Sequence, residues 1–426
     1  MSETLQASLT RLFDAQESGH WADALRRQGR EQFDASGLPS PKEENWRGTN
    51  VTALGKLDFS GGGEQTPILD HPLTQLDLGG PRFVFAGGKL VDRSGDAAEG
   101  LWVGTLAEGR EAFGDRMHEW VSGEESEFGS FEALNRAFLD SGVLVVASAD
   151  HQSDQVVEIV YSLQSNGTPA LQMPRTILVA EKGASLSVVE TFVSRGESET
   201  LTNSVSRAII GENAHIEHAR LQLEGEQGWH VSTVTSRQQR DSRYTGHHFN
   251  LGAKLARHNT RAVLDGEGAN CLLNGLYVAS EQQHVDNDTV LDHAKPHCDS
   301  RELYKGILGG KARSVFTGRI IVREDAQKTD AKQSNPNLLL SPDALAQTRP
   351  QLEIYADDVK CTHGATIGQM DDDAIFYLQA RGLSRAEAKR MLVHAIAGEV
   401  VDAVEVEPLR NALATEIDRR LTEMEG

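Results

Sequence analysis

The residues best suited to binding a metal are a cysteine and a histidine two positions apart, Cys361 and His363. They follow residues 352–359, which alternate as a β-strand does. Because residues i and i+2 of an extended chain point to the same side, a strand that continues would place the thiol and the imidazole side by side. Both groups are ligands for iron or zinc. The pattern also fits a buried, hydrogen-bonded histidine beside a small apolar cysteine.

A second polar cluster occupies residues 284–305. Its candidate ligands or acid–base groups are His284, Asp286, Asp288, Asp292, His293, His297 and Cys298. Alternation predicts that the first three share one face of a strand. The acidic groups of residues 286–292 therefore suggest an alternative function, a carbohydrate-active enzyme. A further interpretation is an exposed polar face whose side chains bond to chain corners.

Several catalytic motifs are missing from the sequence. It contains no Gly-x-x-x-x-Gly-Lys-Ser/Thr loop, and therefore no P-loop for ATP. It also contains no Gly-x-Ser-x-Gly, His-Glu-x-x-His or Cys-x-x-Cys pattern. The missing P-loop argues against a P-loop ATPase.

The elements that must position these residues divide the chain into three parts. Residues 1–140 have a largely helical pattern with a few short strands near residues 82–91. Residues 141–368 are rich in short strands, and an Ala-x-apolar phrase recurs there at Ala184, Ala214, Ala253, Ala269 and, more loosely, Ala312. Few helical patterns separate these strands, which leaves an antiparallel sandwich or a parallel β-helix. Glycine-bearing corners and the scarcity of hairpin dipeptides favour the β-helix.

Residues 369–426 return to a helical pattern. Acidic residues 371–373 suit a helix N-terminus, and Ser384 with Glu387 forms a capping-box pattern. Pro408 opens a last helix whose apolar residues recur every four positions. This helical domain either packs on the β region or docks a partner, and the pattern alone allows both.

Composition limits the class of protein. The chain has 426 residues and a formal net charge of −21, which argues against a nucleic-acid binder and against docking on an anionic membrane. No segment approaches the ~20 apolar residues of a membrane span. The N-terminus shows no secretory signal, and the three cysteines suit a reducing compartment, so we expect a cytoplasmic protein.

The sequence resembles the SufB/SufD family of the Suf iron–sulfur cluster assembly system, and within it the SufD subunits. The resemblance covers nearly the whole length. Its most specific blocks read DHAKPHCDSRELYKGIL, FTGRIIVREDAQKTDAKQSNPNLLLS and PQLEIYADDVKCTHGATIGQMDDDAIFYLQARG. A looser match near the N-terminus reads GLPSPKEENWRGTN.

The resemblance implies a right-handed parallel β-helix flanked by helical regions. It implies a non-catalytic scaffold that forms a heterodimer with a SufB-like subunit through the end of the β-helix. The C-terminal helices would dock a SufC-like ABC ATPase, which alone would use ATP, and sulfur would arrive from a cysteine desulfurase and its carrier. The candidate docking residues are Phe376, Tyr377, Arg381 and Leu383.

The resemblance also implies a role for His363. It occupies the family position that joins a SufB cysteine as a ligand of a transient, shared iron–sulfur cluster, with Cys361 as a second candidate. Neither the residues nor the resemblance assigns Cys271 or Cys298, or decides whether a flavin takes part. A low aromatic content of 6% and the lack of an export signal argue against the carbohydrate-active alternative.

Overall fold

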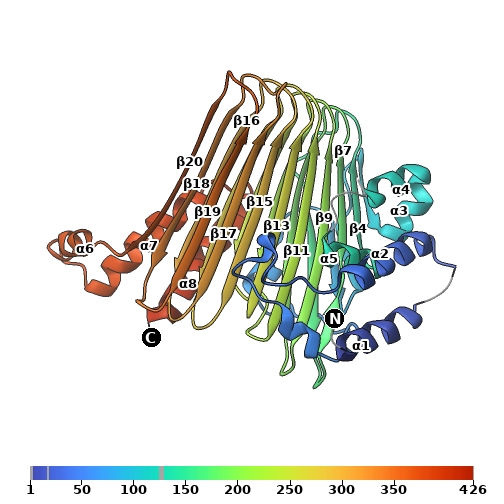
Figure 1. Ribbon diagram of the computed structural model, residues 1–426, viewed down its shortest axis with the longest axis horizontal. Helices are drawn as coiled ribbons and strands as arrows, with labels where there is room; N and C mark the ends of the chain where they lie inside the picture. The colour runs from blue at the N-terminus through green and yellow to red at the C-terminus, as the bar shows by residue number, and fades with distance from the viewer. Residues whose placement is uncertain (1–2, 17–18, 124–128, 426) are drawn as a thin grey trace.

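Two parallel β-sheets stacked into one solenoid form the body of the protein (Figure 1). The computed structural model describes residues 3–16, 19–123 and 129–425. Sheet A has the order β2 (Lys89–Ser94), β1 (Arg82–Ala86), β5 (Val156–Gln164), β8 (Ser185–Arg195), β10 (His215–Gln222), β12 (Arg243–Asn250), β14 (Asn270–Ala279), β16 (Asp299–Leu308), β18 (Asp330–Leu339) and β20 (Lys360–Gln369). Sheet B has the order β19 (Leu345–Ile354), β17 (Arg313–Val322), β15 (His284–His293), β13 (Leu255–Leu264), β11 (Gly228–Gln238), β9 (Thr200–Ile210), β7 (Arg175–Ala180), β4 (Gly142–Ala147) and β3 (Leu101–Thr105), with β6 (Ala170–Gln172) beside β9.

The chain changes sheet after every strand from β7 to β20, so each strand pairs in parallel with the strand two positions later. This connectivity confirms the predicted parallel β-helix and excludes the antiparallel sandwich. The antiparallel pairs β1–β2 and β3–β4 lie at the N-terminal end of the sheets.

A tight corner before the strands of sheet A repeats along the solenoid. A residue of positive φ is followed by a small buried residue and then by the strand, as in Asn213–Ala214 before β10 and Gly268–Ala269 before β14. Ala184 occupies the same place before β8. The predicted equivalence holds for these three alanines but is wrong for Ala253 and Ala312, which lie at corners leading into sheet B.

The interior of the solenoid contains hydrogen-bonded polar side chains as well as apolar ones. The buried Glu190 carboxylate accepts hydrogen bonds from Arg220 Nε at 3.1 Å and Ser206 Oγ at 2.7 Å, and pairs with His218 Nε2 at 2.7 Å. In later coils the hydroxyl of Tyr277 accepts from Asn335 at 3.0 Å. These bonds satisfy polar groups that would otherwise be costly to bury.

Helices cover the outer faces of both sheets. The N-terminal set lies on sheet B and comprises α1 (Glu3–Asp14), α2 (Asp23–Ser36), α3 (Leu106–Phe113), α4 (Asp115–Ser122) and α5 (Ser130–Ala137), with the short turns η1 (Glu44–Trp46) and η2 (Thr52–Lys56). The short turn η3 (Pro72–Thr74) lies on sheet A instead, where its Leu73 packs beside the C-terminal helices. At the other end, α7 (Arg385–Val401) and α8 (Glu407–Glu425) pack on sheet A, whereas α6 (Asp372–Gln379) projects beyond it (Figure 1). None of the helices within the described ranges is long and apolar enough to cross a membrane.

The helical elements confirm the sequence patterns in type and place. Ser384 and Glu387 form the predicted capping box of α7, and Asp371 caps α6. The strand expected over residues 352–359 is wrong, because β19 ends at Ile354 and the chain turns a corner before β20 begins at Lys360. Asp358 lies in that corner and bonds to the preceding coil through Lys328 and Gln327. The division into three domains stays a prediction.

Candidate functional site

The last coil of the solenoid carries the predicted metal ligands. Cys361 and His363 lie on β20, in register with Ala331 and Gln333 of β18. Ala331 and Gln333 are buried, so this side of the sheet faces the interior. Cys361 accordingly packs against the core, while His363 is exposed because β20 is the last strand of sheet A. The structure therefore places the thiol and the imidazole on one face, at the open end of the interior.

This position bears on the two interpretations of the pair. An exposed His363 is not the buried, hydrogen-bonded histidine of the alternative, although its metal binding stays a prediction. Partial burial raises the pKa of the Cys361 thiol, which therefore needs a nearby positive charge to ionise near neutral pH. Two donors fill half of a four-coordinate site, so further ligands are required. In the described ranges, no group of three or more His, Cys, Asp or Glu residues is arranged to hold a metal.

The last coil also presents apolar side chains to solvent. Leu345 is 42% exposed, Ile354 40%, Tyr355 64% and Ile367 48%. Within the described part of the chain, no strand pairs with the outer edges of β19 and β20. Open strand edges beside exposed apolar side chains mark a surface that favours pairing with another chain. We call these four residues and the edges of β19 and β20 the terminal face.

The second polar cluster does not come together as a site. His284 and Asp286 both contact the Thr49 hydroxyl on the outer face of sheet B, and Asp286 also pairs with Arg257. Asp288 accepts from the same Arg257 at 3.2 Å. The predicted shared face of His284, Asp286 and Asp288 is therefore correct, but the two carboxylates are bound by arginine.

The rest of that cluster lies in different surroundings. Asp292 forms a two-point ion pair with Arg323, at 2.9 and 2.7 Å. His293 faces the interior, where burial lowers its pKa to about 4 and Ser300 lies 2.9 Å away. His297 and Cys298 form one of the corners, with His297 at φ 59° and Cys298 as the small buried residue. Strand alternation sends neighbouring residues to opposite faces, which is why this sequence cluster separates.

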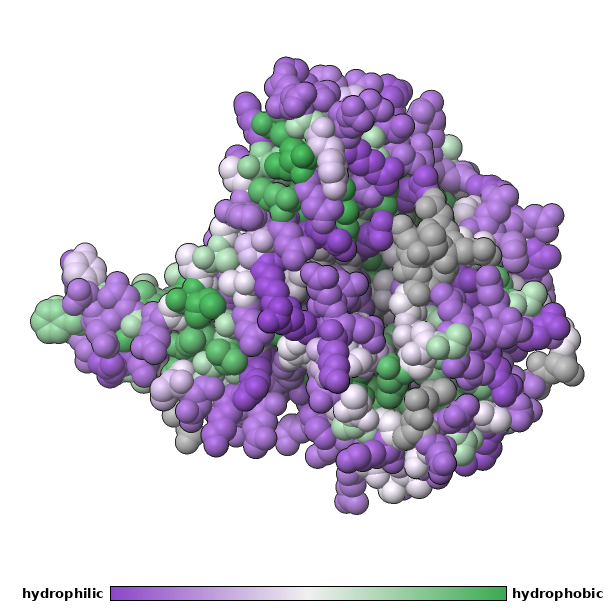
Figure 2. Space-filling view, in the orientation of Figure 1, coloured by the Kyte–Doolittle hydropathy of each residue, from purple (hydrophilic) through white to green (hydrophobic). Residues whose placement is uncertain are grey.

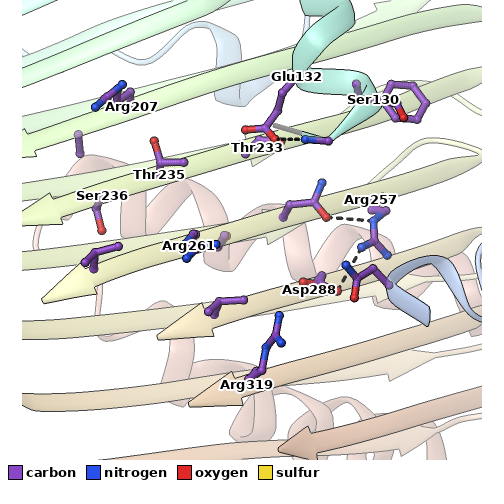
Figure 3. A pocket seen from close by; sticks show the side chains of 18 of the residues that line it. Ser130, Glu132, Arg207, Thr233, Thr235, Ser236, Arg257, Arg261, Asp288 and Arg319 are labelled. Carbon is purple, nitrogen blue, oxygen red and sulfur yellow. Dashed lines mark hydrogen bonds and ion pairs between the residues drawn. The ribbon is translucent and has the colours of Figure 1, made fainter. Parts of the chain in front are cut away.

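A cavity of about 250 Å³ lies on the outer face of sheet B beside Asp288 (Figure 3). Burial raises the pKa of Asp288 to about 6, although Arg257 opposes the shift. The wall also holds Arg207, Arg261 and Arg319, together with the start of α5 at Ser130. The carboxyl groups that the carbohydrate-active alternative requires are thus tied to arginine, and this cavity does not support it.

The two unassigned cysteines are packing residues. Cys298 takes the corner place that Ala269 takes in the preceding coil and Ala214 in an earlier one, and its thiol donates to the carbonyl of Gly266 at 3.3 Å. Burial raises the pKa of Cys298 to about 11 and raises that of the fully buried Cys271. Neutral, enclosed thiols are poor ligands and poor nucleophiles.

The predicted docking residues lie on the arm formed by α6 and the start of α7. Phe376 is 73% exposed and Tyr377 56%, while the Arg381 guanidinium stacks on the Tyr377 ring at 3.4 Å. Leu383 is half-buried in the turn that follows. Figure 2 shows hydrophobic surface along this arm, where it projects from the solenoid. The base of α7 is fixed to the solenoid, because Lys305 of β16 donates to the carbonyl of Ile396 at 2.9 Å.

Comparison with known proteins identifies the family. A model of the SufBD core domain of the SUF system for FeS cluster assembly matches residues 161–396. The chain belongs to the SufBD family. It is 33% identical over 395 residues to the iron–sulfur cluster assembly protein SufD of Escherichia coli, covering 92% of this chain and 91% of that protein. It is 30% identical to a SufBD family protein of Synechocystis, with 88% and 86% covered.

A more distant SufBD relative is the iron–sulfur cluster assembly protein SufD of Bacillus subtilis, 26% identical over 68% of this chain and 66% of that protein. These relatives support a role in iron–sulfur cluster assembly and confirm the family resemblance. The resemblance implied an interface at the end of the β-helix, but the residue pattern did not identify the side chains of the terminal face. The exposure of Leu345, Ile354 and Tyr355 depends on their belonging to the last coil, which the pattern does not show.

Proposed function

We propose that this SufBD family member is a non-catalytic scaffold subunit on which nascent iron–sulfur clusters are assembled. The observation that carries the proposal is His363, exposed beside Cys361 where the solenoid interior opens onto the terminal face. An imidazole and a thiol suit iron, and the remaining donors would come from the molecule that covers this face. The cluster is cargo, held briefly and passed on.

The partner proposed for the terminal face is a SufB-like subunit. It would cover the exposed Tyr355 and Ile367 and satisfy the open strand edges, as β-strand addition does in other complexes. A heterodimer formed there encloses His363 between two chains, which excludes water and restricts the cluster to the assembled complex.

A SufC-like ABC ATPase is the proposed partner of the α6 arm. The chain lacks a P-loop, so ATP would be bound and hydrolysed by that subunit. Tyr377 and Arg381 are of the residue types that dominate interface hot spots. Phe376 and Leu383 add aromatic and aliphatic contact area beside them. We propose a cytoplasmic complex that receives sulfur from a cysteine desulfurase and its carrier. The net charge of this chain, −21, argues against nucleic acid and anionic membranes as partners.

The test is anaerobic co-expression of the chain with SufB-like and SufC-like subunits. We expect all three to co-elute in size-exclusion chromatography with iron and acid-labile sulfide bound. His363→Ala should retain both partners and lose most of the iron and sulfide, because the substitution removes one proposed ligand from an exposed position.

The matched control is His118→Ala, because His118 is an exposed histidine on α4 and is distant in sequence from the terminal face. It should leave iron and sulfide unchanged. Full iron and sulfide in the His363→Ala complex would refute the ligand role. Elution of the wild-type chain alone, free of iron, would refute the scaffold.

A further inference from the structure

A buried amide, Gln333, lies one coil inside His363. The strand register aligns Glu302 of β16 with Gln333 of β18, and Gln333 with His363 of β20. The three residues therefore occupy one inward-facing position in successive strands, which lie about 4.8 Å apart in a sheet. Glu302 and Gln333 are both buried, and only His363 reaches the open end.

The amide group of Gln333 is held from two sides. Its Nε2 donates a hydrogen bond to Oε2 of Glu302 at 2.6 Å. On the sheet B side, the amide fills the space beside Gly318, which has no side chain. A Cβ at Gly318 would lie 2.1 Å from Gln333 Nε2. The nitrogen is thus fixed toward β16 by a bond, and the space for it depends on a glycine.

The oxygen of the same amide is buried and has no hydrogen-bond partner in the described structure. A buried acceptor without a partner costs about 1–3 kcal/mol, so such an atom calls for an explanation. The amide is planar, and with its nitrogen toward Glu302 the oxygen points elsewhere. The next strand on its other side is β20, with His363 in register.

We infer that Gln333 is a positioning residue whose unpartnered Oε1 accepts the N–H of the His363 imidazole when that exposed ring turns toward it. This inference rests on the proposed role of His363 as a cluster ligand. Accepting that proton fixes one tautomer and leaves the other ring nitrogen bare, toward the terminal face. A metal-binding histidine needs this arrangement, because its ligating nitrogen must carry no proton.

Glu302 completes the chain of bonds. Burial raises its pKa to about 7, although the hydrogen bond from Gln333 opposes the shift. A carboxyl group that accepts from the amide nitrogen polarises the amide and strengthens its oxygen as an acceptor. Glu302 thus acts on His363 through Gln333, without touching it.

The test is the tautomer of His363 in the purified full-length chain. Nitrogen-15 NMR of the imidazole rings near pH 8.5, about two units above an ordinary histidine pKa, separates the two neutral tautomers. The signals of His363 are assigned by their loss in His363→Ala. We expect one tautomer in the wild type and a mixture in Gln333→Leu. A second variant, Gly318→Ala, should give the same mixture by displacing the amide while Gln333 remains present.

Two further variants separate positioning from general disturbance. Gln351→Leu makes the same change at an exposed position of β19 and should leave a single tautomer. The double variant Glu302→Gln/Gln333→Glu exchanges donor and acceptor but keeps an acceptor oxygen under His363, and should restore the single tautomer. An unchanged tautomer in Gln333→Leu, or a mixture that the double variant fails to restore, would overturn the inference.

Iron content of the co-purified complex distinguishes this failure from failure of the proposed function. Gln333→Leu should lower bound iron roughly 10-fold, within the 10–100-fold range typical of lost second-layer partners of metal ligands. If His363→Ala loses iron but Gln333→Leu keeps both iron and a single tautomer, the inference fails and the ligand role stands. If His363→Ala keeps its iron, the ligand role fails, and the positioning role with it.

Discussion

Replacing Phe376 by alanine should weaken binding of the SufC-like ATPase by roughly 30- to 150-fold, if the α6 arm is the docking site. A phenylalanine buries about 150–250 Å² when covered, and Phe376 is 73% exposed. At about 25 cal/mol/Å², covering that exposed area contributes about 3–5 kcal/mol. Truncation keeps the β-carbon, so we expect a loss of about 2–3 kcal/mol, at 1.4 kcal/mol for each factor of ten.

The fold should tolerate this change, because replacing an exposed side chain away from helix caps and buried networks usually changes the free energy of unfolding by less than about 0.5 kcal/mol. Deleting the C-terminal helices would be a poorer test. Buried residues of α7 and α8, among them Val393, Leu413 and Ile417, pack on sheet A against Phe249 and Ile307. Their removal would expose that face and confound binding with unfolding.

Isothermal titration of the purified chain with the ATPase measures the effect directly. Val91→Ala serves as the matched control, since Val91 is an exposed apolar residue on β2, at the opposite end of sheet A. It should change the Kd by less than twofold. A change below threefold in Phe376→Ala, or an equal loss in both variants, would contradict docking on the α6 arm.

Three further predictions concern stability and the terminal face. Glu190→Gln should lower the free energy of unfolding in urea by about 3–5 kcal/mol, because it leaves the buried Arg220 without its counter-charge. The control Glu212→Gln removes a charge from an exposed ion pair and should lower it by less than about 1 kcal/mol. Equal effects of the two substitutions would contradict the role of the buried pair. Burial would raise the pKa of Glu190, but hydrogen bonding from His218 and the charge of Arg220 outweigh it and lower that pKa to about 2. The stabilisation from ionised Glu190 is therefore complete above its unfolded-state pKa near 4.5 and is lost as the pH falls toward 2. Thermal melts between pH 5 and pH 2.5 should show this loss in the wild type but not in Glu190→Gln. The same pH dependence in both proteins would rule out this contribution of Glu190. Tyr355→Asp should abolish co-elution with the SufB-like subunit without altering the melting temperature, and full co-elution would argue against the terminal face.

The sequence predicts the architecture well and the site in part. Short strands with few helices between them indicate the solenoid, and the spacing of Cys361 and His363 indicates a shared face. The change of sheet between Ile354 and Lys360 escaped prediction, because alternation continues through a corner as it does through a strand. The pairing of Asp286 with Arg257 was equally hidden, since period-two patterning does not show which residues of the next coil lie alongside.

The polar interior has a consequence for how the coils find their alignment during folding. If a coil slides by two residues, every inward side chain still points inward, so burial of apolar groups alone barely opposes that error. The buried bonds do oppose it. Asn335 bonds to the Tyr277 hydroxyl two coils away, and Glu190 bonds to Arg220 of the next coil, only when the coils are in the correct register. Such buried pairs destabilise a solenoid whose strands are out of register, and they thereby determine which side chains lie at the open end beside His363.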